Sequence, residues 1–268
     1  MILSRKPMPS PWFRVYLARP HATARLICLP HAGGTASFFS EWAHYLPETI
    51  ELVAIQYPGR QERLAEPLIN NMQMLTQALA EAISTILDRP YILFGHSMGA
   101  AVGHELCMTL MARKQRLPER LIVSAREAPM HNQAGSLHSA PEPIFCKRLI
   151  ELGNTPAELL QSDEWCKIML PIIRNDYQLI ETYVPKPQHA ALPINISAFA
   201  GNKDNELTVE QAADWSSLTS KSFDLRVFDG DHFYLCEHRA SVVAEAIRSF
   251  RSQPASLYDK PMAWPSTP

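Results

Sequence analysis

Short apolar segments alternate with segments of helical periodicity along most of the chain, and this alternation limits the folds available to it. Residues 11–18 form a candidate edge strand. Six further segments have the length and apolar content of buried strands: residues 24–30, 51–58, 91–95, 120–125, 194–201 and 223–230. Helical patterns lie between them, at residues 37–46, 72–87, 98–113, 208–218 and 240–251. Apolar strands that alternate with helices predict an α/β fold, with a mostly parallel sheet covered by helices on both faces.

One long segment, residues 130–188, departs from this alternation. It has no strand pattern, but it has helical patterns at residues 142–153, 155–161 and 163–184. Pro171 predicts a kink or a break in the last of them. We interpret the segment as a helical lid inserted between two strands. The chain is expected to form a single domain over residues 1–252, followed by a loosely ordered tail over residues 253–268, where Pro and Ser are frequent.

The composition of the chain argues against several classes of protein. Its 268 residues are 46% hydrophobic and carry a net charge of −2, which suits one large core and argues against binding to nucleic acid. The five cysteines are odd in number and include no Cys-x-x-Cys pair, so neither a disulfide framework nor a zinc site is expected. No segment is apolar enough for a signal peptide or for the ~20 residues of a membrane span. We expect a monomeric cytoplasmic protein that binds neither nucleic acid nor membrane.

The sequence GHSMG, residues 95–99, follows the apolar segment YILF and precedes a long helical pattern. It matches G-x-S-x-G, in which a serine occupies a tight turn between a strand and a helix and raises its hydroxyl above the edge of the sheet. The flanking glycines let neighbouring backbone approach without a clash at Cβ. Ser97 is therefore the predicted nucleophile, and the helix after it directs the positive end of its dipole at developing negative charge.

A serine hydroxyl needs a base, and in this arrangement the acid and then the histidine follow the serine in the chain. His232 lies just past the last strand, in FDGDHFYL, and is the predicted base, whereas His238 is interpreted as a surface or capping residue. The acid is expected directly after the preceding strand, where AFAGNKDNELT offers Asp204 and, two residues on, Glu206. We favour Asp204, which would fix the imidazole tautomer and stabilise the imidazolium.

Two backbone N–H groups are needed to hold the oxyanion that forms when a serine attacks a carbonyl group. One is expected from Met98, the residue after the nucleophile. The other is expected from the loop LPHAGGTASFF after an early strand, where Ala32 precedes two glycines. Neither a metal ion nor an organic cofactor is needed for acyl transfer to water by these groups, and none is expected.

Seven blocks of the sequence together resemble the type II thioesterases, the stand-alone editing hydrolases that accompany nonribosomal peptide and polyketide synthetases. The blocks keep the family's order and rough spacing from Leu29 to Leu235: LPHAGG, YPGRQER, GHSMGA, SAREAP, LGNTPAELL, LPIIRNDYQLIETY and DGDHFYL. The resemblance implies an α/β-hydrolase fold with a helical lid. It also implies hydrolysis of acyl or aminoacyl thioesters on the phosphopantetheine arms of carrier proteins, which are the implied partners.

The resemblance also carries over residue by residue. Ser97, Asp204 and His232 stand at the family's triad positions, and Ala32 and Met98 stand at its oxyanion positions. Two other functions stay open from the residues: a general carboxylesterase or acyltransferase of the same fold, and a non-catalytic binding protein. The first would turn over oxygen esters well and be indifferent to carrier proteins. The non-catalytic function is disfavoured because Ser97, Asp204 and His232 are all present.

Two of the blocks have plainer interpretations. YPGRQER, residues 57–63, is favoured as a turn at a strand end followed by solvated charges, over a role in shaping the chamber or in docking. Tyr177, Ile180 and Tyr183 recur at helical spacing, and we expect them to pack the lid onto the core and not to contact substrate.

Overall fold

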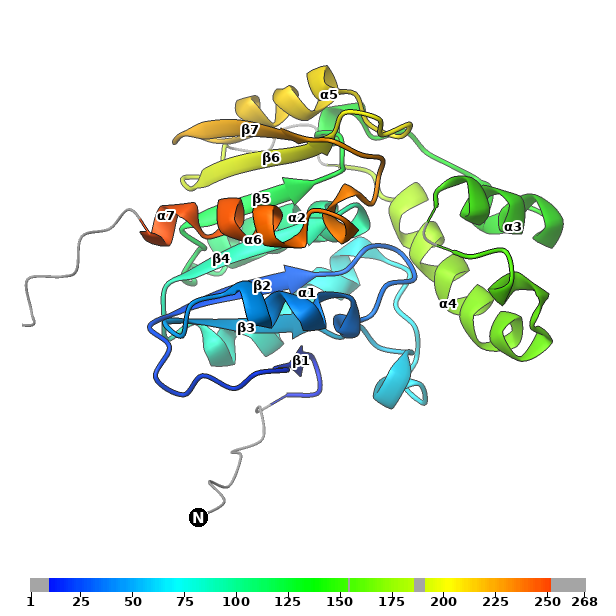
Figure 1. Cartoon of the computed structure of the whole chain (residues 1–268), viewed down its shortest axis with the longest axis horizontal. Coiled ribbons are helices and arrows are strands. Elements are labelled where there is room, and N and C mark those ends of the chain that lie inside the picture. The colour runs from blue at the N-terminus through cyan, green and yellow to red at the C-terminus, as the bar shows by residue number, and fades with distance from the viewer. Residues whose placement is uncertain (1–9, 154, 186–190, 252–268) are drawn as a thin grey trace, which may run out of the picture.

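A seven-stranded sheet runs through the centre of the protein (Figure 1). The computed structural model describes residues 10–153, 155–185 and 191–251. The strands are β1 (Phe13–Arg14), β2 (Ala24–Leu29), β3 (Ile50–Ile55), β4 (Tyr91–His96), β5 (Arg120–Ser124), β6 (Asn195–Gly201) and β7 (Phe223–Phe228). Their order across the sheet is β1-β3-β2-β4-β5-β6-β7, and β1 pairs antiparallel to β3 whereas the other pairs are parallel. The predicted α/β fold is confirmed, and each strand overlaps its predicted segment.

Helices cover both faces of this sheet. One face carries α1 (Met72–Ile83), η3 (Ser84–Ile86), α2 (Met98–Ala112), α5 (Val209–Ala213) and η7 (Asp214–Leu218), and the other carries η1 (Ala36–Tyr45), α6 (Arg239–Ala246) and α7 (Arg248–Arg251). The predicted helix at residues 37–46 is a 3-10 helix. Three other predicted helices, at residues 72–87, 208–218 and 240–251, each consist of two consecutive helices. Short 3-10 turns also occur as η2 (Gln61–Arg63) and η8 (Tyr234–Cys236).

The central strands are buried on both faces, which explains why they are apolar throughout. In β2, Ile27 and Leu29 belong to the core under α1 and α2. Leu26 and Cys28 belong to the core under η1 and α6. Successive side chains of a strand point to opposite faces, so one run of four apolar residues supplies both cores.

The helical insertion lies between β5 and β6 and consists of η4 (Pro129–His131), η5 (Leu137–Ser139), α3 (Glu142–Glu151), η6 (Leu159–Gln161) and α4 (Asp163–Glu181). Figure 1 shows α3 and α4 beside the end of the sheet toward which the parallel strands point. The insertion has a small core of its own, built around Phe145, Leu149, Leu170 and Ile173. We call this segment the lid.

Pro171 does not end α4, so the predicted break is wrong. A proline inside a helix removes one backbone hydrogen bond. Leu170, Ile172 and Ile173, directly beside it, are all buried, and their packing holds the helix together across the proline. The tail over residues 253–268 lies outside the described residues. Within the part of the chain that is described, no helix combines the length and apolar character needed to cross a membrane.

The helix α2 approaches the sheet closely through two glycines. A Cβ on Gly99 would lie 2.2 Å from the backbone oxygen of Leu29 and 2.7 Å from that of Pro30. A Cβ on Gly103 would meet the side chains of Leu29 and Leu121 at 3.1 and 3.2 Å. The first contact is with backbone that has little freedom to move, whereas the second is with flexible side chains.

We therefore predict that Gly99→Ala destabilises the protein and that Gly103→Ala does so far less. Overpacking against backbone costs about 1–3 kcal/mol or more. At Gly103 the strain is partly offset by the ~1 kcal/mol that alanine gains over glycine inside a helix. Chemical denaturation of the two variants measures the difference, and equal stability of both would contradict this account of how α2 is placed.

Candidate active site

Ser97 occupies a strained turn between β4 and α2. Its φ is 53° and its ψ is −118°, a backbone conformation that non-glycine residues rarely adopt. Its amide donates a 2.7 Å hydrogen bond to the carbonyl oxygen of Ser124, at the end of the neighbouring strand β5. A Cβ on Gly95 would lie 2.2 Å from the Gly99 oxygen, so the turn closes this tightly because both of its ends are glycine. The geometry is that of a nucleophile elbow.

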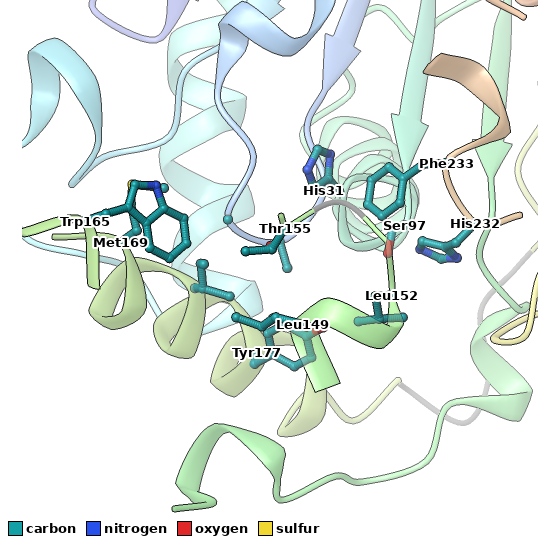
Figure 2. Close-up of a pocket in the computed structure, with 13 residues that line it drawn as sticks. His31, Ser97, Leu149, Leu152, Thr155, Trp165, Met169, Tyr177, His232 and Phe233 are labelled. Carbon is teal, nitrogen blue, oxygen red and sulfur yellow. The ribbon is translucent and has the colours of Figure 1, made fainter. Parts of the chain in front are cut away.

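His232 and Asp204 meet beside this serine. His232 Nδ1 lies 2.9 Å from Asp204 Oδ2 and 3.1 Å from Oδ1. The Asp204 side chain is fully buried. Because an ionised carboxylate can only accept, Nδ1 carries the proton in this contact and Nε2 is left to act as a base. Figure 2 shows the Ser97 hydroxyl next to the His232 ring, and both residues line the same cavity.

The sequence left two acids open, and the structure brings one of them to the histidine. Asp204 follows β6 directly, and its Oδ1 also accepts the Glu206 amide at 2.8 Å. Glu206 itself turns outward and forms an ion pair with Arg148 of α3. Asp204 is thus held both by its own turn and by His232, while Glu206 links the acid turn to the lid.

Two further histidines lie near the serine, and both are neutral. Burial, together with the charges of His232 and Arg60, lowers the pKa of His31 to about 3. Burial also lowers the pKa of His96 well below its usual range. His96 Nδ1 lies 2.9 Å from the Ser124 hydroxyl, which is 2.7 Å from the Tyr234 hydroxyl. His96 is therefore directed at Ser124 and, through that hydroxyl, connects the serine turn to Tyr234 in the segment after His232.

A cavity of about 170 Å³ opens over Ser97. The core contributes His31, Ala32, Gly33, Ser97, His232 and Phe233 to its wall, and the lid contributes Leu149, Leu152, Thr155, Trp165, Met169, Ile173 and Tyr177 (Figure 2). Among the described residues, none of those that line it is a lysine, arginine, aspartate or glutamate. Over the described residues, no group of three His, Cys, Asp or Glu side chains is placed to hold a metal ion. The wall of the chamber is therefore mainly apolar, with polar groups from His31, Ser97 and His232 of the core and from Thr155, Trp165 and Tyr177 of the lid.

The two predicted oxyanion donors, Ala32 and Met98, belong to the loop after β2 and to the start of α2. Met98 is the first residue of α2, where backbone N–H groups have no acceptor within the helix. Ala32 lies in the wall of the chamber, in the loop after β2. The His31 oxygen accepts the Gly34 amide at 2.9 Å, so this loop closes as a tight turn.

Two interpretations made from the sequence need correction. Arg60 and Arg63 of YPGRQER are only 2% and 4% exposed, so two of the three charges of this block are buried and not solvated. Charged residues are seldom buried unless they are paired, which is why the sequence pattern misled. Tyr177 lines the chamber, so it does not merely pack the lid onto the core. Ile180 and Tyr183 do pack into the main core, as expected.

Comparison with known proteins relates most of the chain to one family. A family model for the thioesterase domain matches residues 24–250. The chain is 36% identical to the thioesterase PikA5 of Streptomyces venezuelae, over 84% of this chain and 80% of that protein. It is 35% identical to the gramicidin S biosynthesis protein GrsT of Aneurinibacillus migulanus, over 90% of this chain and 94% of that protein.

Among solved structures, the type II thioesterase BorB from the borrelidin biosynthetic cluster superposes with a TM-score of 0.79 and 38% identity, over 88% of this chain and 98% of that one. The fold and site thus define a serine hydrolase of the α/β-hydrolase class that acts on thioesters. The chain belongs to the thioesterase domain family.

The contrasting positions of the two acids predict contrasting effects of substitution. Asp204→Asn should lower turnover by ~10⁴-fold, because an amide beside Nδ1 favours the wrong imidazole tautomer. Glu206→Gln should keep turnover within about twofold, since its exposed ion pair with Arg148 contributes little. Steady-state hydrolysis of a p-nitrophenyl ester measures both. The reverse order of effects would move the acid to Glu206.

Proposed function

We propose that this protein is an editing type II thioesterase, which hydrolyses acyl and aminoacyl groups from the phosphopantetheine arms of carrier proteins in nonribosomal peptide or polyketide synthesis. The observation that carries the proposal is the His232–Asp204 hydrogen bond beside Ser97, at the floor of a mainly apolar chamber roofed by the lid. The relatives support the substrate class, since GrsT is named for gramicidin S biosynthesis and BorB comes from the borrelidin cluster.

In the first half of the proposed reaction, the Ser97 oxygen attacks the thioester carbonyl carbon while His232 Nε2 takes the hydroxyl proton. The carbonyl oxygen becomes an oxyanion, which the amides of Ala32 and Met98 stabilise; removing one such donor typically costs ~10²–10³ in rate. The carbon–sulfur bond then breaks, and His232 returns the proton to the departing pantetheine thiol. The product is an ester between the acyl group and Ser97.

In the second half, a water molecule attacks this ester while His232 Nε2 takes a proton from it. A second oxyanion forms on the same two amides. The bond to Ser97 breaks, the serine oxygen recovers the proton, and the free acid leaves. Asp204 stabilises the imidazolium in both halves through the Nδ1 contact and stays ionised itself.

We further propose that the lid moves to admit the substrate arm. A thin pantetheine arm needs a narrow entrance to the chamber. Hydrolysis of acyl groups of different sizes needs chamber walls that can change position. Seven of the thirteen residues that line the chamber come from the lid, so its position sets the size of the chamber. We place the protein in the cytoplasm, where its five free cysteines would stay reduced.

The proposed nucleophile is tested by Ser97→Ala. The variant should fold normally but lose ~10⁴-fold or more in turnover, since loss of one triad member disables the whole set. A fluorophosphonate probe should label the wild-type protein and leave the variant unlabelled. Residual turnover above about a tenth of wild type, equivalent to ~1.4 kcal/mol of barrier, would exclude Ser97 as the nucleophile.

The carrier partner is tested by comparing three donors of one acyl group: a carrier protein, coenzyme A and a p-nitrophenyl ester. Binding energy from the carrier surface, remote from the thioester, can be used to position the carbonyl over Ser97. We expect kcat/KM to be at least ~10-fold higher for the carrier-bound group. Equal efficiency on all three donors would favour a general esterase.

A further inference from the structure

We propose that Arg60 and Asp176 are positioning residues that hold the loop bearing the Ala32 amide, so that the lid helix α4 takes part in forming the oxyanion site. The proposal deepens the proposed function and rests on it. It comes from a buried ion pair that the mechanism above does not use. Asp176 belongs to α4, and Arg60 belongs to the YPGRQER block after β3.

The two side chains form a paired contact. Arg60 Nη1 lies 2.6 Å from Asp176 Oδ2, and Nη2 lies 2.8 Å from Oδ1. The same Arg60 Nη1 donates to the backbone oxygen of Gly34 at 3.0 Å. The same Asp176 Oδ2 accepts the backbone amide of Gly33 at 2.8 Å. The ion pair therefore binds two consecutive residues of the loop: Arg60 donates to the oxygen of Gly34, and Asp176 accepts from the amide of Gly33.

Gly33 and Gly34 are the last two residues of a four-residue turn, His31 to Gly34, that contains Ala32. The hydrogen bond from the Gly34 amide to the His31 oxygen closes it, and Gly33 has a φ of 73°. A positive φ at the third position is the mark of a type II turn, whose central peptide is flipped relative to a type I turn. The central peptide here joins Ala32 to Gly33, and Asp176 accepts its N–H. The carboxylate thus selects the turn form in which the Ala32 backbone is held.

Helix α4 also touches the turn directly. A Cβ on Gly33 would lie 2.7 Å from Ile173 Cγ1, one helical turn before Asp176. The helix is fixed at this level by further contacts with the core: Asn175 donates to the Ile69 oxygen at 3.0 Å, and Asn70 donates to Gln178 at 2.9 Å. The turn therefore rests against a part of the lid that is itself anchored.

The energetics favour a positioning role over a merely structural one. Arg60 and Asp176 are each 2% exposed. A buried ion pair is weak evidence for stability, because an apolar pair of similar volume is often equally stable or more so. A backbone amide held by a charged acceptor, in contrast, gains a strong and directional hydrogen bond. Arg60 also neutralises a carboxylate that would otherwise oppose negative charge developing close by.

The test compares two disruptions of this pair with a matched control. Asp176→Asn removes the charge with little change in shape. The double variant Arg60→Met with Asp176→Leu removes both charges and the acceptor, and leaves no unpaired charge that would prevent folding. Glu51→Gln is the control, because Glu51 forms a similarly buried pair with Arg25 at 3.2 Å, at the far end of the parallel strands.

Two quantities are measured for each folded variant: kcat and KM on a p-nitrophenyl ester, and the inhibition constant of a trifluoromethyl ketone, which forms a tetrahedral oxyanion on the serine. We expect kcat to fall about 10-fold in Asp176→Asn and about 100-fold in the double variant, within the range that small misplacement of catalytic groups produces. KM should change less than about threefold, and binding of the ketone should weaken in proportion to kcat. Glu51→Gln should keep both quantities within about twofold.

A double variant that is folded and keeps wild-type kcat would overturn the inference, as would equal losses in Glu51→Gln. A rise in KM without loss of kcat would do the same, since it would assign the pair to substrate binding. These outcomes are separable from failure of the proposed function. If Ser97→Ala is inactive while the double variant is fully active, only the positioning role falls. If Ser97→Ala is active, the proposed function falls.

Discussion

The backbone of Ser97 is the constraint on which the rest of the site depends. A residue with φ of 53° and ψ of −118° costs ~1–3 kcal/mol and persists only where its surroundings determine it fully. Here β4 is a central strand between β2 and β5, α2 leaves it at once, and the Ser97 amide is bound by Ser124. The serine can be displaced only by moving strand, helix and neighbour together.

The parallel arrangement of the sheet then assembles the other groups. The loops after β2, β4, β6 and β7 all leave the same edge, and they carry Ala32, Ser97, Asp204 and His232 respectively. Residues more than a hundred positions apart in the chain therefore lie close together, because each is carried by a loop at the same edge of the sheet. The insertion after β5 leaves from the same edge, which is why α3 and α4 lie beside the site (Figure 1).

Much of this could be predicted from the sequence because the signals were local. Apolar runs mark strands that are buried on both faces, GHSMG marks a turn that needs its glycines, and Asp204 follows its strand directly. What the sequence could not indicate was long-range pairing. Arg60 and Asp176 lie 116 residues apart, and a charged block such as YPGRQER is usually solvated unless a distant partner buries it. The break predicted at Pro171 was wrong for the same reason. The helix α4 continues through the proline because its neighbours are buried in packing that only the folded chain provides.

The paired contact between Arg60 and Asp176 also refines the idea of a moving lid. The part of α4 that is anchored includes Ile173, Asn175 and Asp176, which contact the loop after β2 or the segment before α1. The lid motion proposed above would therefore leave this level in place and displace α3 and the first turns of α4. Such a motion would open the chamber and keep the proposed oxyanion site intact.

The central claim is that the acyl group passes through Ser97, and rapid-quench mass spectrometry tests it most directly. The wild-type protein is mixed with an excess of acylated carrier protein, quenched in acid within the first turnovers and digested. The account predicts that the peptide containing Ser97 gains the mass of the acyl group. Acylation of a different residue, or product formed in the first turnovers while every enzyme peptide keeps its unmodified mass, would contradict it.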